Sequence, residues 1–300
     1  MKNTLDIGNG LSQKLFLSPR TVRFKKFANR LFSNPVTLTG AIIIFVMVFV
    51  SAFAFLIAPY DPLELHIKDR VQGPSSTYWL GTDEAGRDLL SNLLYAGRIS
   101  LSAAVAAEGA GILFGLPFGL VAGFWRGKVD DVIMRFMDGL LAFPTVLLAL
   151  TIVGLFGSSL RNLILAIGIT FMPVVARIVR ASVIQERDKD YVLAANALGA
   201  PSWRIVVRHI LPNSFAPLIV QISLGIAFAI LLEASLSFLG LGVQPPRTSW
   251  GVLLAEGYGY ITRTFSYVTF PGLFIFVTVW ALNVLGDGIR DTLDPRLRGS

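Results

Sequence analysis

The chain has 300 residues, of which 54% are hydrophobic and only 15% are charged, and its mean hydropathy is +0.65. Soluble domains are about half apolar and about a quarter charged, so this composition indicates a membrane protein. The formal charge of +7 does not indicate nucleic-acid binding, because the basic residues are dispersed among apolar spans. The lack of cysteine excludes disulfides, thiolate nucleophiles and cysteine-based metal sites.

The N-terminal part predicts a cytoplasmic tail followed by a membrane span. Residues 1–35 carry seven lysines and arginines against one acid, and residues 36–58 carry no charge. A span of that length crosses a hydrocarbon core of roughly 30 Å. Ala52-Phe53-Ala54 has the form of a signal-peptidase site, but the long basic lead and the length of the span favour an uncleaved first transmembrane helix.

Residues 59–98 form the longest polar segment and are expected outside the cytoplasm. Thr82 or Asp83 can cap a following helix, which we expect to lie along the membrane surface before the second span. One side of that helix is apolar, with Leu89, Leu90, Leu93 and Leu94. The capping role accounts for the acids of this segment better than a cation site does.

The second span, at about 99–124, has glycines at strict four-residue spacing: Gly111, Gly115, Gly119 and Gly123. Glycines one turn apart remove side chains from one helix face, so a neighbouring helix can approach closely. The alternative is that membrane helices are rich in glycine in general. The regular spacing favours a packing face, within this chain or against a neighbouring subunit.

The remaining apolar segments complete an all-α membrane protein with six transmembrane helices and both termini in the cytoplasm. Further spans are expected at about 132–156, 162–179, 214–239 and 268–286, so that residues 99–286 form a five-helix core and residues 287–300 a cytoplasmic tail. In this topology the cytoplasmic segments hold 19 lysines and arginines and the opposite side holds seven. This bias follows the positive-inside rule.

Two acids, Glu108 and Glu233, lie deep in the second and fifth spans, in the outer half of the bilayer. An acid facing lipid is costly, so both are expected to face the bundle interior or a translocation path. One interpretation is that they accept hydrogen bonds between helices. The other is that they line or gate an outward opening.

The cytoplasmic loop at 181–213 is predicted to form two short helices. Gly199 can end the first helix in the left-handed conformation, Pro201 suits the start of the second, and Pro212 stops it. The first helix presents small residues and the second an aliphatic face, which together suit docking into a groove of a partner. The small residues are Ala194, Ala195 and Ala197, with Leu198 on the same face, and the aliphatic ones of the second helix are Ile205, Val206 and Ile210.

This loop resembles the Glu-Ala-Ala loop of permease subunits in ATP-binding-cassette importers. Five residues match that pattern at the same spacing: Ala194, Ala195, Gly199, Leu211 and Pro212. Leu193 and His209 depart from it, at the glutamate and isoleucine positions. The segments 79–88, 232–246 and 285–296 are also similar to the dipeptide, oligopeptide and nickel branch of these permeases, and to the second subunit of its permease pair.

The resemblance implies an importer-type permease fold in the bacterial cytoplasmic membrane. It implies a second homologous permease, two cytoplasmic ATP-binding subunits and an extracytoplasmic solute-binding protein as partners. The coupling loop to the ATPases would include Ala194, Ala195, Gly199, Ile205, Leu211 and Pro212. Peptides are the commonest cargo of the family, and nickel chelates, glutathione, opines and sugars are the alternatives.

No catalytic, cofactor-binding or metal-binding motif is expected in this chain. A P-loop needs a set spacing of glycines before Lys and Ser or Thr, and the nearest stretch, Gly123 to Val129, lacks it. ATP and Mg²⁺ would therefore be held by separate subunits. The two histidines, His66 and His209, fall in opposite polar segments. The competing function is an ion-coupled secondary transporter, in which Glu108, Asp138 and Glu233 would carry ions.

Overall fold

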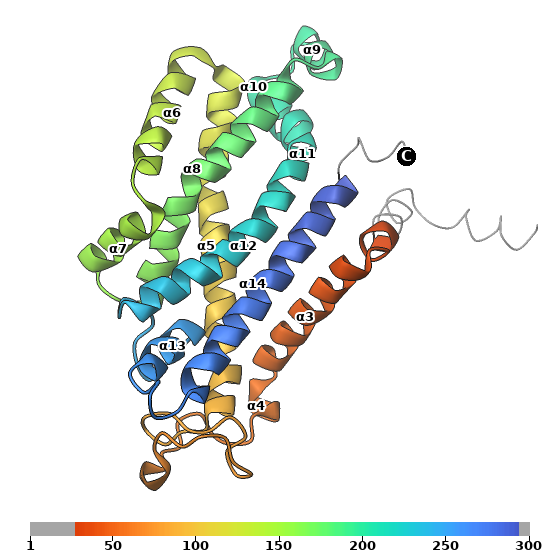
Figure 1. Cartoon of the computed structure of the whole chain (residues 1–300). Coiled ribbons are helices and arrows are strands. Elements are labelled where there is room, and N and C mark those ends of the chain that lie inside the picture. The colour runs from red at the N-terminus through yellow and green to blue at the C-terminus, as the bar shows by residue number, and fades with distance from the viewer. Residues whose placement is uncertain (1–27, 294–300) are drawn as a thin grey trace, which may run out of the picture.

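The computed structural model describes residues 28–293, and within them the chain is almost entirely helical, with no β-strand beyond a single bridge between Thr82 and Asp88. The long helices, in chain order, are α3 (Pro35–Ala52), α5 (Leu89–Trp125), α6 (Gly127–Leu141), α7 (Thr145–Phe156), α8 (Leu160–Arg187), α12 (Phe215–Phe238) and α14 (Ser266–Leu293) (Figure 1). The shorter helices are α4 (Ala54–Ile57), α9 (Asp190–Ala197), α10 (Ser202–Ile205), α11 (Leu211–Asn213) and α13 (Trp250–Tyr258).

Five helices among the described residues are long and apolar enough to cross a membrane, namely α3, α5, α8, α12 and α14. The pair α6–α7 gives a sixth span if the two helices are counted together. This pair replaces the straight third span that the sequence predicted at 132–156, because it is bent by 88° at residues 142–144. Pro144 explains the break, since proline disfavours a helical conformation in the residue before it.

The second span is also longer than predicted, because α5 is one continuous helix of 37 residues. It begins directly after Asp88, whose carboxylate accepts a hydrogen bond from the Ser91 N–H at 2.8 Å. The prediction of a separate surface helix within 59–98, capped by Thr82 or Asp83, is therefore wrong. At 1.5 Å per residue α5 is about 55 Å long, which exceeds the thickness of a hydrocarbon core.

Two other helices extend past their predicted ends. The fourth span continues to Arg187 as α8, and the sixth continues to Leu293 as α14, so part of the predicted C-terminal tail is helical. Both extensions are polar turns that follow an apolar span, where no proline stops the helix. The N-terminal tail up to residue 27 and the last seven residues lie outside the described part of the chain.

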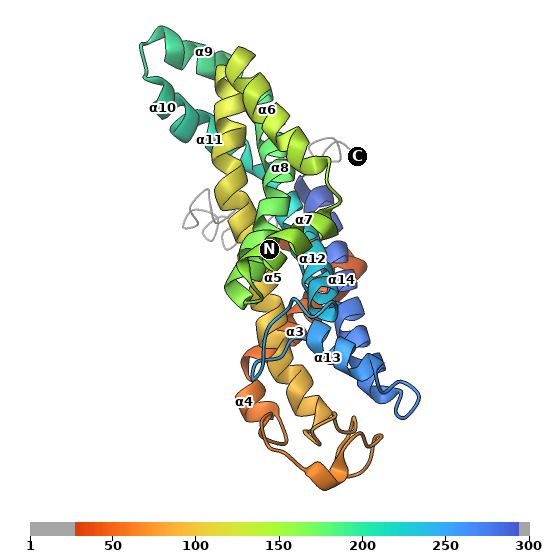
Figure 2. The same cartoon turned by 90° about the vertical axis from the view of Figure 1, so that its left-hand side faces the viewer.

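The glycine face of α5 packs against α8. Cβ atoms added at Gly115 and Gly119 would lie 2.8 Å and 2.7 Å from the Cβ atoms of Val175 and Val179. They would also lie within 2.6 Å of backbone carbonyl oxygens of α8. Figures 1 and 2 both show the two helices side by side. The four-residue spacing thus produces close contact between two helices of the same chain.

Two ion pairs join α6 to the C-terminal half of α8. Arg180 binds Asp130 through two parallel hydrogen bonds of 2.5 and 2.6 Å, and Arg177 binds Asp138 at 2.7 Å. Bidentate pairing fixes the relative orientation of the two helices as well as stabilising them. Asp138, which the sequence offered as an ion carrier, therefore has a basic partner within the chain.

We expect Gly115→Leu and Gly119→Leu to prevent the approach of α5 to α8. The added side chains would meet backbone atoms, which cannot rotate away, and overpacking typically costs about 1–3 kcal/mol. The recovery of monodisperse protein after detergent extraction should fall. Gly109→Leu is the matched control on the same helix, because a Cβ there meets nothing within 4 Å. Equal recovery of all three variants would contradict the close-packing role.

Candidate functional site: the cytoplasmic loop and the buried acids

The cytoplasmic loop projects from one end of the molecule as a helical hairpin (Figure 1). Helix α9 ends before Gly199, which has a φ of +76°, and α10 begins after Pro201. A π-helical turn over Val206–Ile210 then leads into α11. Gly199 therefore occupies the left-handed position that the sequence predicted, where a β-branched residue would be strained.

Tyr191 connects the two ends of this hairpin through hydrogen bonds. Its hydroxyl donates a hydrogen bond to Glu186 at 2.5 Å and accepts one from Asn213 at 3.2 Å, which connects the ends of α8 and α11. Desolvation and the hydrogen bond to the Glu186 carboxylate raise the pKa of Tyr191 to about 12. The hydroxyl thus keeps its proton at neutral pH and remains a donor. The loop is a defined unit attached to α8, and not a loose connection.

The aliphatic face of the second helix is turned inward, which corrects one sequence prediction. Ile205 and Ile210 are fully buried, and they belong to a cluster that includes Val183 of α8 and Leu218 of α12. Ile205 is therefore a residue that anchors the loop, and its side chain is unavailable to a partner. The hairpin folds back onto the ends of its neighbouring helices, so the chain itself covers this face.

The residues that the loop exposes are partly different from those that the sequence singled out. Ala194 and Pro212 are exposed, whereas Ala195 and Leu211 are half-buried. The large exposed side chains are Leu198 at 88% and Trp203 at 65%, on either side of the Gly199 turn, together with Leu193 and Val207. Large apolar side chains that a charged loop leaves uncovered are typical of an interaction site. The sequence had placed Leu198 on the small face of the first helix, but it had not singled out Trp203.

Glu233 is completely buried and holds three elements together at the outer end of the bundle. Its two carboxylate oxygens accept hydrogen bonds from Ser237 of α12 at 2.7 Å and from Ser100 of α5 at 3.2 Å. The Ser100 hydroxyl in turn accepts the N–H of Trp250, the first residue of α13, at 3.1 Å. Glu233 is therefore the centre of a hydrogen-bond network that connects α5, α12 and α13, which we call the hydrogen-bond hub.

Glu108 is also buried, at 1% exposure, but its environment is different. Among the described residues neither of its carboxyl oxygens has a hydrogen-bond partner. It lies between α5 and α12, where Gly225 leaves room for it: a Cβ at Gly225 would be 2.1 Å from one of its oxygens. Its role in a pathway or gate stays a prediction.

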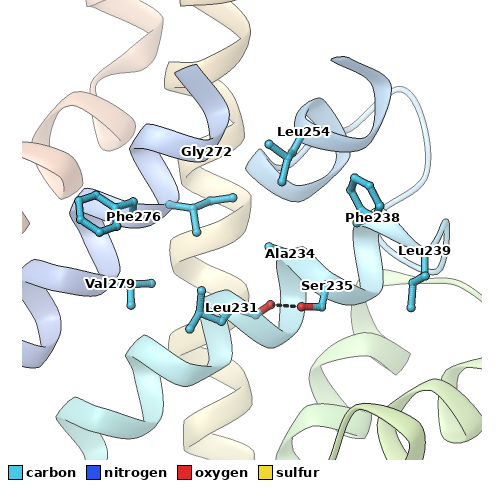
Figure 3. Close-up of a pocket in the computed structure, with 10 residues that line it drawn as sticks. Leu231, Ala234, Ser235, Phe238, Leu239, Leu254, Gly272, Phe276 and Val279 are labelled. Carbon is cyan, nitrogen blue, oxygen red and sulfur yellow. Dashed lines mark hydrogen bonds between the residues drawn. The ribbon is translucent and has the colours of Figure 1, made fainter. Parts of the chain in front are cut away.

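An apolar groove with a volume of ≈ 720 Å³ lies between α12, α13 and α14 (Figure 3). Its lining is Leu231, Ala234, Ser235, Phe238, Leu239, Leu254, Gly272, Ile275, Phe276 and Val279. The only hydroxyl, that of Ser235, is bonded to the Leu231 carbonyl of its own helix at 2.7 Å. Neither Glu108 nor Glu233 lines the groove, so it offers no charged group to a cargo.

The arrangement of helices is that of an importer-type permease. Two solved chains of the MetNI methionine ABC transporter in inward-facing conformations match with TM-scores of 0.54 and 0.56, both at 18% identity. They cover 66% and 69% of this chain, and 94% and 98% of their own. At this identity the likeness concerns the fold alone.

Sequence relatives define the family. The model of the binding-protein-dependent transport system inner membrane component matches residues 115–299, and that of the N-terminal transmembrane domain of oligopeptide transport permease C matches residues 23–74. The chain belongs to this family of inner-membrane permease subunits of bacterial ATP-binding-cassette importers.

Curated relatives match over nearly their whole length. The dipeptide transport system permease protein of Alkalihalophilus pseudofirmus is 40% identical, covering 94% of this chain and 91% of the relative. The di/tripeptide permease of Pseudomonas aeruginosa is 42% identical, with 92% and 93% covered. The glutathione permease of Pectobacterium atrosepticum is 39% identical, with 92% of each covered.

We expect Glu233→Gln to destabilise the outer end of the bundle by about 1–2 kcal/mol. Glutamine has only one side-chain oxygen, whereas both oxygens of Glu233 accept a hydrogen bond from a serine hydroxyl. Thermal unfolding of the purified chain in detergent measures this change. Ser235→Ala, which removes only a hydroxyl bonded to its own helix, is the control. Unchanged unfolding together with altered transport of charged cargo would instead assign Glu233 to the pathway.

Proposed function

We propose that this chain forms half of the translocation pathway of a bacterial peptide importer. The observation that supports this cargo is its identity of about 40% with dipeptide and di/tripeptide permeases, over more than nine-tenths of this chain and of each relative. The other half is a second, homologous permease subunit. The exposed apolar faces of α12 and α14, with the groove between them, are suitable surfaces for such a neighbour in the membrane.

Transport is driven by two separate ATP-binding subunits on the cytoplasmic side. This chain has no P-loop of its own, and ATP and Mg²⁺ are bound by those partners. The cytoplasmic hairpin docks into a groove of one ATPase through the exposed surface around Gly199, with Leu198 and Trp203 as its largest contacts. Because Tyr191 and Ile205 attach the hairpin to α8 and α12, a displacement of the hairpin acts directly on two membrane helices.

A solute-binding protein delivers the cargo from the outer side. Di- and tripeptides are the proposed substrates. Glutathione is the second candidate, because a glutathione permease is 39% identical over 92% of the chain. Nickel chelates, opines and sugars are the other solutes moved by similar permeases.

Uptake into proteoliposomes tests the function. The assembled importer, with its binding protein outside, should take up labelled di- or tripeptides only when ATP is present inside, and a proton gradient should not change the rate. Glutathione competes in the same vesicles only if it is a substrate. Uptake that follows the proton gradient without ATP would replace this proposal with an ion-coupled transporter.

We expect the double variant Leu198→Ser, Trp203→Ser to uncouple the importer, because truncating central apolar anchors typically costs an interface about 2 kcal/mol or more per residue. Co-purification of the ATPase and ATP-driven uptake should both fall at least tenfold. Val132→Ser is the control, since that side chain is 68% exposed on α6 and does not belong to the hairpin. Normal uptake by the double variant would show that the ATPase docks elsewhere.

A further inference from the structure

The outer segment between α4 and α5 has almost no regular secondary structure, yet its backbone is held in place by buried polar side chains. Asp83 is fully buried, and its carboxylate accepts the N–H groups of Ala85 and Arg87 at 2.8 Å each and binds the Arg87 guanidinium at 2.5 Å. Backbone hydrogen bonds link Val71 to Asp83 and Gln72 to Thr82. The segment is therefore a folded unit.

Three aromatic rings form the inner side of the first part of this segment. The ring centroids of Tyr60, His66 and Tyr78 lie 5.5–6.3 Å apart. The Tyr78 hydroxyl donates to Asp69 at 3.2 Å, and burial raises its pKa, so it remains a donor. Gly86 packs so closely on His66 that an added Cβ would lie 2.0 Å from the His66 carbonyl oxygen. Residues 61–67, which we call the outer strap, are thus held on a fixed support.

The outer strap leaves three aliphatic side chains exposed, at alternate positions of the chain. Leu63, Leu65 and Ile67 are 56%, 59% and 70% exposed. The segment has folded around its aromatic rings and still leaves these side chains uncovered. Exposed apolar side chains that lie close together on a rigid frame mark a contact surface for another molecule.

The position of the strap indicates from which direction that molecule arrives. The short 3₁₀ helix that begins at Ile67 lies at the end of the molecule opposite α9, beyond the ends of α4 and α5, in both views (Figures 1 and 2). A second permease or a lipid meets the sides of the membrane helices. A surface on the far end faces the aqueous space outside, where only a soluble or water-exposed partner can reach it.

We propose that the outer strap is a docking surface for the solute-binding protein, with an apolar patch of that protein seated on Leu63, Leu65 and Ile67. This inference rests on the proposed function. The family is described as binding-protein-dependent, and the match to the N-terminal domain of oligopeptide transport permease C ends at residue 74, so it includes the strap. The strap is therefore part of the domain that marks this type of permease.

The complete importer in lipid nanodiscs, with its purified binding protein, tests the proposal. Leu63→Ser, Leu65→Ser and Ile67→Ser together should weaken binding of that protein about tenfold or more, since apolar anchors carry most of an interface's affinity. ATP hydrolysis without the binding protein should be unchanged. Leu155→Ser, at a side chain 77% exposed at the end of α7, is the matched control and should bind normally.

Failure of the proposed docking surface and failure of the proposed function give different results. Unchanged affinity in a triple variant that still hydrolyses ATP overturns the docking surface and leaves the proposed function in place. A wild-type complex that neither hydrolyses ATP nor binds any solute-binding protein overturns both.

Cross-linking identifies the partner directly, because the natural chain has no cysteine and a single one can be labelled. A photo-activated cross-linker on Ile67→Cys should form an adduct with the binding protein, and one on Leu155→Cys should not. An adduct of Ile67→Cys with the second permease or with lipid alone overturns the proposal.

Discussion

The close approach of α5 to α8 is the constraint on which the rest of this structure depends. Side chains of α8 contact the backbone of α5 along a whole helix face, because the glycines of α5 have no side chains that would hold the two helices apart. Helix α6 is then joined to α8 by its arginine pairs, and the aliphatic face of the cytoplasmic hairpin is buried in the cluster that includes Val183, at the end of the same contact. The cytoplasmic half of the molecule is therefore organised around a single helix pair.

A second fixed point lies at the opposite end of α5. The indole N–H of Trp250 donates to the Leu93 carbonyl at 3.0 Å, and the backbone N–H of Trp250 reaches Glu233 through Ser100. Both bonds lie where α13 crosses α5. These polar groups are buried, so the loss of one leaves its neighbour unsatisfied. Helix α5 thus connects a packing contact at the cytoplasmic side with a hydrogen-bond hub at the outer side.

Much of this architecture could be predicted from the sequence, because the thickness of the bilayer sets the length of each apolar span and the glycine spacing identifies a packing face. The sequence did not predict the break at Pro144, because one proline hardly changes the mean hydropathy of a long apolar segment. The true start of α5 was missed because a helix can continue into water once Asp88 has capped it.

The side chains of the cytoplasmic loop show a different limit. A pattern of aliphatic residues indicates that one helix face is buried, but it does not say against what. Ile205 was therefore assigned to a partner although α8 and α12 cover it. Leu198, which the sequence placed on the small face of the first helix, does remain uncovered, whereas Trp203 is also uncovered but belongs to no pattern in the sequence. Glu108 and Glu233 were both expected in the bundle interior, but the hydroxyl donors around one and their absence around the other depend on how the helices are arranged in space.

The contact between α5 and α8 has one more consequence, which concerns its register. Each glycine faces the side chain at the matching step of α8: Gly111 faces Phe171, Gly115 faces Val175, Gly119 faces Val179 and Gly123 faces Val183. Since both rows repeat every four residues, a slide of one step, about 6 Å, would bring each of the last three glycines opposite another large side chain of the row. The repeat by itself does not distinguish these alignments. The alignment is selected by the groups that do not repeat: Arg126 at the end of α5 pairs with Asp188 at the end of α8, and Arg187 of α8 donates to the Phe124 carbonyl of α5. Specificity in the longest apolar contact of the molecule is thus supplied by a few charged side chains at its cytoplasmic end.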